Sequence, residues 1–276
     1  MNMWRQDTKT IIVTSTGGSC IIVPKEAKAV VKKELYDYPY ITKSQKLIKS
    51  KSMDIVFLSN GEANADENYE NLVLITKEVS NRLIRISDIN GRVASQHAAA
   101  NASSSPWYFL VNGKLRVSPK FDFSWQPDRL QIPKHYIFTA TNPLNGLEYG
   151  HQAIVANNKK LTLDTIVQGL DFTLDSEHEV ININSGKGMF NSSEWDTWRT
   201  AFRETIKLRY DETKSSKMRL EVWLTKANGN FAEYSLQGAK HAIEYYEEVN
   251  GDFDKLRLSY DWAWLLSRFN SKYDII

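Results

Sequence analysis

The chain has 276 residues, of which 42% are hydrophobic and 12% aromatic, so it can bury a substantial core and is not a disordered protein. Its 35 basic and 33 acidic residues leave a net charge of +2, which argues neither for nor against nucleic-acid binding by the whole chain. The single cysteine excludes an intrachain disulfide framework and a zinc site built from several cysteines. Cys20 lies in an apolar run, where a buried structural cysteine is the expectation.

The sequence also predicts where the protein is found. No apolar run reaches the roughly 20 residues that a membrane-spanning helix needs. Residues 1–7 lack the charged and then apolar pattern of a signal peptide. We therefore expect a cytoplasmic protein with no membrane partner.

Residues 1–52 are predicted to form an N-terminal segment of their own. Periodicity is lost over residues 36–52, which marks a boundary. The rhythm of residues 16–25 resembles that of residues 149–159, so the segment also fits the tail of a preceding repeat. Eight lysines between Lys25 and Lys51 fit either a solvated helix face with a linker or a contact to nucleic-acid phosphates.

Residues 53–212 alternate between strand and helix patterns. Three apolar runs predict strands at 54–58, 83–86 and 108–111, separated by helical patterns at 66–75 and 93–100. Further strands are expected at 136–139, 152–155 and 180–183, and a helix at 195–206 behind Ser193. Residues 213–276 are mostly helical, with Leu236, Ala239, Ile243 and Tyr246 on one apolar stripe that is typical of packing. We predict an α/β fold with a mixed, mostly parallel, Rossmann-like sheet flanked by helices and followed by a helical C-terminal extension.

The stretch WYFLVNGKLRV, residues 107–117, predicts a turn. Asn112-Gly113 between two apolar runs is typical of a two-residue β-hairpin, whose type I′ turn needs positive φ at both residues. In the simplest interpretation, Lys114 only begins the outer arm of that hairpin.

Polar residues follow each of the first three predicted strands of this region. These residues are Asn60, Gly61, Glu62 and Asn64 after the first, Asp88, Asn90 and Arg92 after the second, and Asn112, Gly113 and Lys114 after the third. In a parallel sheet the carboxyl ends of the strands meet at one crevice, so we expect a binding site there. Each residue alone also fits a helix cap, a turn former or a solvated charge.

Five stretches together resemble a known group of proteins: SNGEANAD at 59–66, PWYFLVNGK at 106–114, FDFSW at 121–125, NPLNGLEYGH at 142–151 and WRTAFRE at 198–204. Their order resembles that in a largely uncharacterised family from tailed marine phages and other large DNA viruses, whose better-preserved members look like glycosyltransferases of the GT-A fold. The resemblance covers about residues 50–270. It implies a GT-A-like core that binds a nucleotide sugar.

In that family pattern the third strand ends in Asp-x-Asp, whose carboxylates hold Mn²⁺ or Mg²⁺ against the donor diphosphate. Here Asn112 stands at the first aspartate and Lys114 at the second, which speaks against the usual metal. A lysine ammonium supplies positive charge without a metal, so we expect Lys114 to replace the cation and no metal ligands to be present.

The resemblance also implies roles for residues outside the turn. It places Glu62, Asp88 and Asn112 against the nucleotide, Arg92 and His97 beside the donor, and His151 near the acceptor. Asp171, a carboxylate among apolar neighbours, is the candidate general base, although a helix cap or a core ion pair explains it equally well. Arg199 and Arg203 lie four residues apart and fit either phosphate binding or pairing with nearby acids.

The sequence thus supports three hypotheses. The first is a glycosyltransferase-like protein, metal-independent, that transfers a sugar from a nucleotide sugar to an unidentified acceptor such as a glycan or modified DNA. The second is an inactive GT-A-like module that binds sugar or nucleotide, or is structural, which the loss of both Asp-x-Asp carboxylates favours. The third is a nucleic-acid binder that uses the lysines of residues 25–51.

Overall fold

The computed structural model describes residues 52–128, 132–166, 169–170 and 172–273, together with four short strands nearer the N-terminus. These strands form two antiparallel pairs, β1 (Asn2–Gln6) with β2 (Thr10–Thr14) and β3 (Ala29–Val31) with β4 (Pro39–Ile41). Compactness divides the chain into one unit of residues 1–52 with 122–126, and a second unit of all other residues. The predictions for Cys20, for the lysines of residues 25–51 and for a repeat at 16–25 lie outside the described residues.

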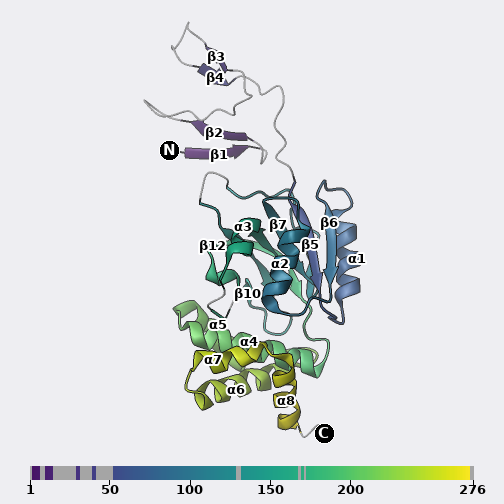
Figure 1. Ribbon diagram of the computed structural model, residues 1–276, viewed down its shortest axis with the longest axis vertical. Helices are drawn as coiled ribbons and strands as arrows, with labels where there is room; N and C mark the ends of the chain where they lie inside the picture. The colour runs from purple at the N-terminus through teal and green to yellow at the C-terminus, as the bar shows by residue number, and fades with distance from the viewer. Residues whose placement is uncertain are drawn as a thin grey trace. The chain divides into compact units, whose positions relative to one another are not determined.

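The second unit contains an eight-stranded sheet (Figure 1). Seven strands form its main path in the order β6–β5–β7–β11–β9–β12–β8, and β10 pairs with β9. The strands are β5 (Asp54–Ser59), β6 (Leu83–Ser87), β7 (Trp107–Asn112), β8 (Leu115–Val117), β9 (His135–Thr141), β10 (Glu148–Tyr149), β11 (Val155–Asn158) and β12 (His178–Gly188).

Five of these eight strands run in one direction. Strand β5 pairs in parallel with β6 and β7, and β9 pairs in parallel with β12. Strand β11 runs antiparallel between β7 and β9, so β9 and β12 point the same way as β5. The remaining strands, β8 and β10, are antiparallel to their neighbours. The predicted α/β fold with a mixed, mostly parallel, Rossmann-like sheet is therefore confirmed.

Eight α-helices surround the sheet in the described part of the chain. They are α1 (Ala65–Thr76), α2 (Arg92–Ala102), α3 (Lys159–Asp164), α4 (Glu194–Asp211), α5 (Lys214–Thr225), α6 (Ala232–Glu248), α7 (Phe253–Leu256) and α8 (Trp262–Tyr273). Of two 3₁₀ turns, η1 (Thr173–Asp175) lies between α3 and β12, and η2 (Arg257–Tyr260) lies between α7 and α8. In the part of the chain that is described, none of these helices is long and apolar enough to cross a bilayer.

Strand β5 is fully buried because helices cover both of its faces. Val56 and Leu58 pack with Ala99 and Ala100 of α2, whereas the ring of Phe57 contacts Tyr69 of α1, on the opposite face. Successive side chains of a strand alternate between faces, so a continuous apolar run is expected where both faces are covered. The predicted strand–helix order over residues 54–111 is confirmed.

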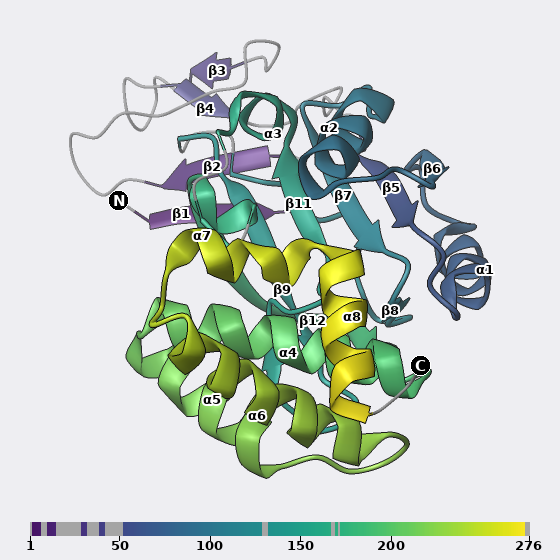
Figure 2. The same cartoon turned by 60° about the horizontal axis from the view of Figure 1, so that its bottom comes forward.

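The helical C-terminal part is confirmed as well. Figures 1 and 2 show α4 to α8 gathered together at one end of the sheet. Helix α4 begins at Ser193, whose Oγ accepts a hydrogen bond from the backbone N–H of Asp196 at 3.0 Å. Its buried residues Trp198 and Phe202 pack against α6 and α8. Because α4 packs with α5, α6 and α8, this helical cluster begins before residue 213.

Helix α6 buries a face adjacent to the predicted stripe. Its buried residues are Ser235, Gly238, Ala239, Ala242 and Tyr245, so Leu236, Ile243 and Tyr246 lie only on the flank. The cause is close helix packing, since a Cβ on Gly238 would come within 2.5 Å of the backbone oxygen of Trp198. Small residues allow α6 to approach α4, and an apolar pattern alone does not reveal that distance.

The strand predicted at 152–155 begins instead at Val155. His151 and Gln152 form a turn, and Gln152 has a φ of 61°. The apolar residues Ala153 and Ile154 are buried, but they precede the strand. The apolar residues therefore predicted the buried segment correctly, but they placed the start of the β-strand three residues too early.

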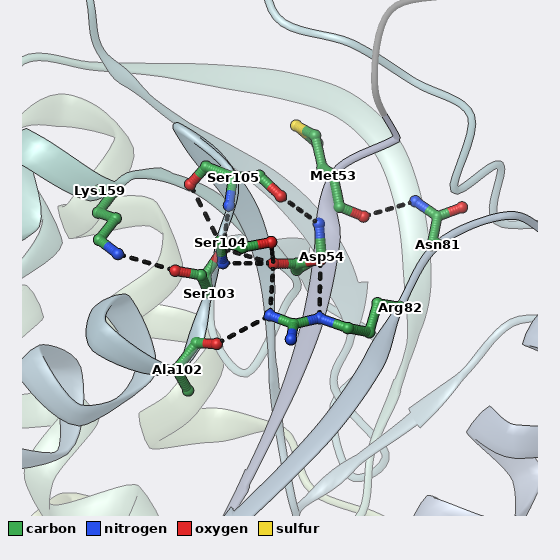
Figure 3. Close-up of polar contacts among 9 residues, drawn as sticks. All are labelled: Met53, Asp54, Asn81, Arg82, Ala102, Ser103, Ser104, Ser105 and Lys159. Atoms are coloured by element: carbon green, nitrogen blue, oxygen red, sulfur yellow. Dashed lines mark hydrogen bonds and ion pairs between the residues drawn. The ribbon is translucent and has the colours of Figure 1, made fainter.

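A polar cluster holds the amino end of β5, opposite to the strand end that carries the predicted site (Figure 3). The carboxylate of Asp54 accepts hydrogen bonds from Arg82, from Ser103 Oγ and from the N–H and Oγ of Ser104. Burial alone raises the pKa of this carboxyl, but these donors, Arg82 foremost, hold the pKa at about 2. The cluster ties β5 to the residue directly before β6 and to the segment directly after α2, so we assign it to stability.

Candidate functional site

The turn at Asn112–Lys114 is not a hairpin. Strand β7 lies between β5 and β11, whereas β8 pairs with β12 at the far edge of the sheet. Gly113 donates its N–H to Leu58 O at 2.8 Å and so continues the pairing with β5, and neither Asn112 nor Gly113 has a positive φ. The predicted type I′ turn is wrong, and with it the interpretation of Lys114 as the outer arm of a hairpin. The turn leads the chain across the carboxyl ends of the strands.

Gly113 is required for space. A Cβ there would come within 2.6 Å of Glu62 Oε2 and 3.2 Å of Ser59 Cβ. On α1, the buried Asn68 donates its side-chain amide to Gly113 O at 2.8 Å. The turn is thus fixed against the end of β5 and against α1.

We expect Gly113→Ala to lower the free energy of unfolding by roughly 1–3 kcal/mol, because the added methyl group displaces Glu62. The matched control is Gly188→Ala, since a Cβ on Gly188 meets its nearest neighbour at an ordinary 3.4 Å. Urea denaturation of both variants measures the difference. Equal losses in the two variants would contradict the tight packing of the turn.

Lys114 follows this turn and is nearly buried. Its side chain is 12% exposed, and its Nζ lies 3.5 Å from Asp196 Oδ1 at the start of α4. Burial, and next the positive charge of Arg199, lower the pKa of Lys114 to about 8, although Asp196 acts in the opposite direction. The negative charge of Asp196 therefore does not fully offset the effects of burial and of Arg199 on the Lys114 ammonium.

Helix α4 brings two more cations to the same place. Arg199 is 5% exposed and donates to Asp196 Oδ1 at 2.6 Å. Burial lowers its pKa first, and Arg203 adds to the effect. The Nε of Arg203 is buried and has no hydrogen-bond partner among the described residues. We call Lys114, Arg199 and Arg203 the basic cluster.

Among the described residues, two carboxylates face the basic cluster, and both are already engaged. Asp196 accepts from Arg199 and from the hydroxyls of Ser192 and Ser193. Glu62 Oε2 accepts the backbone N–H of Asn60 at 2.7 Å, and Ala65 N–H binds the backbone oxygen of Glu62 at 2.9 Å. In the described part of the chain, three cations thus share two carboxylates, which leaves an excess of positive charge in the cluster.

The residues at the basic cluster do not fit the Mn²⁺ or Mg²⁺ that the family resemblance implies. Such ions prefer several oxygen ligands, chiefly carboxylates. The position of the second family aspartate carries the ammonium of Lys114, which points to a basic environment. The described residues hold no group of three histidine, cysteine, aspartate or glutamate side chains suited to a metal.

An aromatic segment, Tyr260 to Trp262, lies against the arginines. The guanidinium carbon of Arg199 is 4.0 Å from the ring centre of Trp262. Those of Arg203 and Arg92 are 4.5 Å and 4.3 Å from the ring centre of Tyr260. Cation–π contacts of this kind attract the segment to the basic cluster.

His151 belongs to a buried network beside the cluster. Its Nε2 lies 3.8 Å from Glu204 Oε2, and burial lowers the pKa of His151 to about 4. Glu204 also accepts from Tyr149 Oη at 2.9 Å and pairs with Lys207 at 2.7 Å. Trp223 Nε1 in turn donates to Tyr149 Oη at 2.9 Å. The predicted acceptor-side histidine therefore lies inside a polar network between the sheet and the helical part.

The other predicted residues fall in different surroundings. Arg92 begins α2, donates to Leu170 O at 2.7 Å and joins the aromatic segment through Tyr260. His97 contacts Phe172 edge-on, and its Nε2 is buried without a partner among the described residues. Asp88 is exposed, has a φ of 60° and accepts from Ser87 Oγ, which fits a turn former.

Two further predicted residues complete the comparison. Asn112 is half-buried at the end of β7, directly before the turn. Asp171 lies outside the described residues. The structure thus brings Glu62, Lys114, Arg199 and Arg203 together, whereas Asp88 and His97 lie in other contacts.

Sequence reasoning missed Asp196, Glu204 and Trp262 as members of the site. Asp196 was given no role in the sequence analysis, yet residues 196, 199 and 203 share one face of a helix at three- and four-residue steps. That spacing is a signal that could have grouped them. Trp262 carries no such signal, because only the tertiary fold brings it to Arg199.

A separate cavity of about 640 Å³ lies on the second unit. It is lined mainly by polar and small residues and contains none of the basic cluster. Its lining includes Asn71, Arg116, Ser118, Thr141, Asn142 and Lys187.

Comparisons of the chain with models of known families, with curated proteins and with solved structures find no match.

Proposed function

We propose that the basic cluster binds the diphosphate of a nucleotide sugar, and that the protein is a GT-A-like glycosyltransferase that acts without a metal ion. The observation that carries the proposal is the excess of cations over carboxylates, counted over the described residues, at the carboxyl ends of β5 and β7. Ligands of open α/β sheets bind at these strand ends. We also propose that the protein belongs to the viral family that its sequence resembles, and that it is located in the cytoplasm.

The charge arrangement supports an anionic ligand. Buried cations are costly unless an anion compensates them, and one oxygen of Asp196 lies within ion-pair distance of both Lys114 and Arg199. A diphosphate carries several negative oxygens, and guanidinium groups bind such oxygens through paired hydrogen bonds. Groups whose pKa is strongly shifted by burial and by neighbouring charges are common at functional sites, and Lys114 is such a group.

The same cations suit the chemistry of glycosyl transfer. The bond from the sugar's anomeric carbon to the diphosphate oxygen breaks, the acceptor oxygen forms a new bond to that carbon, and the electron pair leaves with the diphosphate. Lys114 stabilises the charge that develops on this leaving group, as a fixed cation does in a site prepared for it. Asp171 stays our candidate for taking the acceptor proton, and the acceptor is a glycan or modified DNA.

A second candidate is an inactive module that binds the nucleotide sugar without transfer. It is favoured by one observation, that Glu62 and Asp196, the two carboxylates facing the basic cluster, are both engaged in hydrogen bonds. A base must be able to accept a proton from the acceptor. Binding with no turnover would therefore select this candidate.

The first experiment measures thermal stability with a panel of nucleoside diphosphates and nucleotide sugars, in the presence of a chelator. A ligand at about a hundred times its dissociation constant adds roughly 2.7 kcal/mol to the free energy of unfolding. We expect at least one nucleotide to stabilise the protein without metal. Release of free nucleoside diphosphate from that donor then separates transfer or hydrolysis from binding alone. Absence of stabilisation by every nucleotide would overturn the proposal.

Binding is also expected to depend on pH through Lys114. Its pKa of about 8 means that the side chain is charged below pH 8 and becomes neutral above it. An anionic ligand favours the charged form, so affinity should fall as the pH rises through about 8. In Lys114→Arg the cation persists and this fall should be absent. The measurement is calorimetric titration of both proteins from pH 6.5 to 9.5. The ligand's own ionisation affects both proteins equally, so it drops out when their affinities are compared. If the two affinities change with pH in the same way, the role of Lys114 is contradicted.

A further inference from the structure

We propose that Trp262 is the surface on which the base of the bound nucleotide stacks. This inference rests on the proposed diphosphate site and adds the part of the ligand that Trp262 recognises. Trp262 is the first residue of α8. Asp261 caps the start of this helix, because its Oδ1 accepts a hydrogen bond from the backbone N–H of Trp264 at 3.0 Å. The position of the ring is therefore set by a helix end.

Trp262 is exposed although a cation covers one of its faces. The guanidinium carbon of Arg199 lies 4.0 Å from the ring centre, and yet 53% of the residue is exposed. With one face in contact with Arg199, this exposure belongs to the other face and to the ring edges. Neighbouring large aromatics of the helical part, such as Trp198 and Phe269, are buried in its core. Trp262 is thus an aromatic surface open to a ligand.

A chain of short contacts joins Trp262 to the basic cluster. Lys114 Nζ lies 3.5 Å from Asp196 Oδ1, and Arg199 binds the same oxygen at 2.6 Å. The same guanidinium group of Arg199 also contacts the indole ring of Trp262. Because these three short contacts follow one another, the distance from the Lys114 ammonium to the Trp262 ring does not exceed about the length of one nucleotide. A diphosphate at Lys114 and a base at Trp262 therefore fit one ligand.

The chemistry of the ring favours a base over a sugar. A guanidinium on one face draws electron density from the indole, so the open face attracts the electron-rich ring of a base. Stacking on an aromatic side chain accepts any base, because every base has a π face. We therefore expect Trp262 to strengthen binding of nucleotides in general, with little choice among bases.

The test is calorimetric titration of the full chain, in chelator, with inorganic pyrophosphate and with the nucleoside diphosphate that stabilises it most. The proteins are the native form, Trp262→Ala, Trp262→Phe and, as a matched control, Leu266→Ala, which removes another exposed apolar side chain of α8. We expect Trp262→Ala to weaken nucleoside diphosphate binding by about tenfold or more. Pyrophosphate binding should change less than about twofold in that variant. Trp262→Phe and Leu266→Ala should resemble the native protein with both ligands.

The outcomes separate this inference from the proposed function. If Trp262→Ala weakens pyrophosphate and nucleotide equally, Trp262 acts only through Arg199 and the inference is wrong. The same conclusion follows if both affinities stay unchanged. If the native protein binds neither ligand, the diphosphate site itself is wrong and the inference falls with it. Thermal denaturation of each variant confirms that the compared proteins are folded.

Discussion

Replacing Lys114 with methionine is expected to abolish diphosphate binding and to raise the melting temperature. The side chain is nearly buried beside Arg199, and Asp196 keeps Arg199, Ser192 and Ser193 as partners without it. An apolar side chain of similar length removes a surplus charge and leaves no carboxylate unpaired. Replacing buried ionic groups in this way is often stabilising by about 1–4 kcal/mol.

The pH dependence gives the sign of this effect. Since the pKa of Lys114 falls from 10.5 to about 8 on folding, the unfolded chain binds the proton more tightly between these values. The stability contribution of this group therefore rises as the pH increases from about 8 to 10.5, and Lys114→Met should lack that rise. Urea denaturation at pH 7 and pH 10 measures it.

Lys187→Met, at an exposed position of β12, is the matched control and should change neither stability nor binding much. A loss of stability in Lys114→Met, with binding intact, would show instead that Lys114 is a structural partner of Asp196. The combination of higher stability and lost binding is what a residue retained for its ligand produces.

Replacing Glu204 with alanine should have the largest effect on stability. This carboxylate is 4% exposed and serves Tyr149, Lys207 and His151 between the sheet and α4. Removing one member of a buried charge pair costs about 3–5 kcal/mol, and because the partner Lys207 is 26% exposed we expect a loss at the lower end of this range. Urea denaturation at pH 7 measures this loss.

The pKa of Glu204 predicts an acid transition as well. Burial alone raises it, but Lys207 and the other partners outweigh burial and lower it to about 2. A carboxyl whose pKa is lowered on folding stabilises the fold above its unfolded value of 4.5, and this stability is lost as the pH falls towards 2. The difference between native protein and Glu204→Ala should therefore shrink from pH 7 to pH 3.

Glu244→Ala provides the comparison for Glu204, because Glu244 is on α6, is 55% exposed and pairs with Lys272 at 2.7 Å. An exposed ion pair of this kind contributes about 0–1 kcal/mol. Similar losses in the two variants would contradict a special role for the buried network.

The sequence predicted the strand–helix order well because local patterns determine it. The apolar run at β5 and the three- and four-residue spacing of Trp198 and Phe202 in α4 were sufficient for both elements. The turn at Asn112-Gly113 was misjudged because a hairpin and a crossing turn share the same residues, and only the pairing of β8 with β12 separates them. The buried face of α6 was predicted slightly wrongly, because the close approach of α6 to α4 requires Gly238 and other small residues at the contact, and these do not stand out in an apolar pattern.

The candidate site was predicted in part, for a physical reason. Glu62 and Lys114 lie at strand ends, and the topology of a parallel sheet brings strand ends together. Arg199 and Arg203 were correctly paired on one helix face, but their approach to Lys114 depends on how α4 packs on the sheet. Trp262 is far from all of them in sequence, so no local pattern indicates it.

The central claim is that Lys114 and its two arginines bind a diphosphate without a metal. Calorimetric titration of the native protein with the best nucleoside diphosphate, once in chelator and once in Mn²⁺, tests it most directly. We predict saturable one-to-one binding in chelator, with an affinity that Mn²⁺ does not improve. Binding that requires Mn²⁺, or no binding in either condition, would contradict the claim.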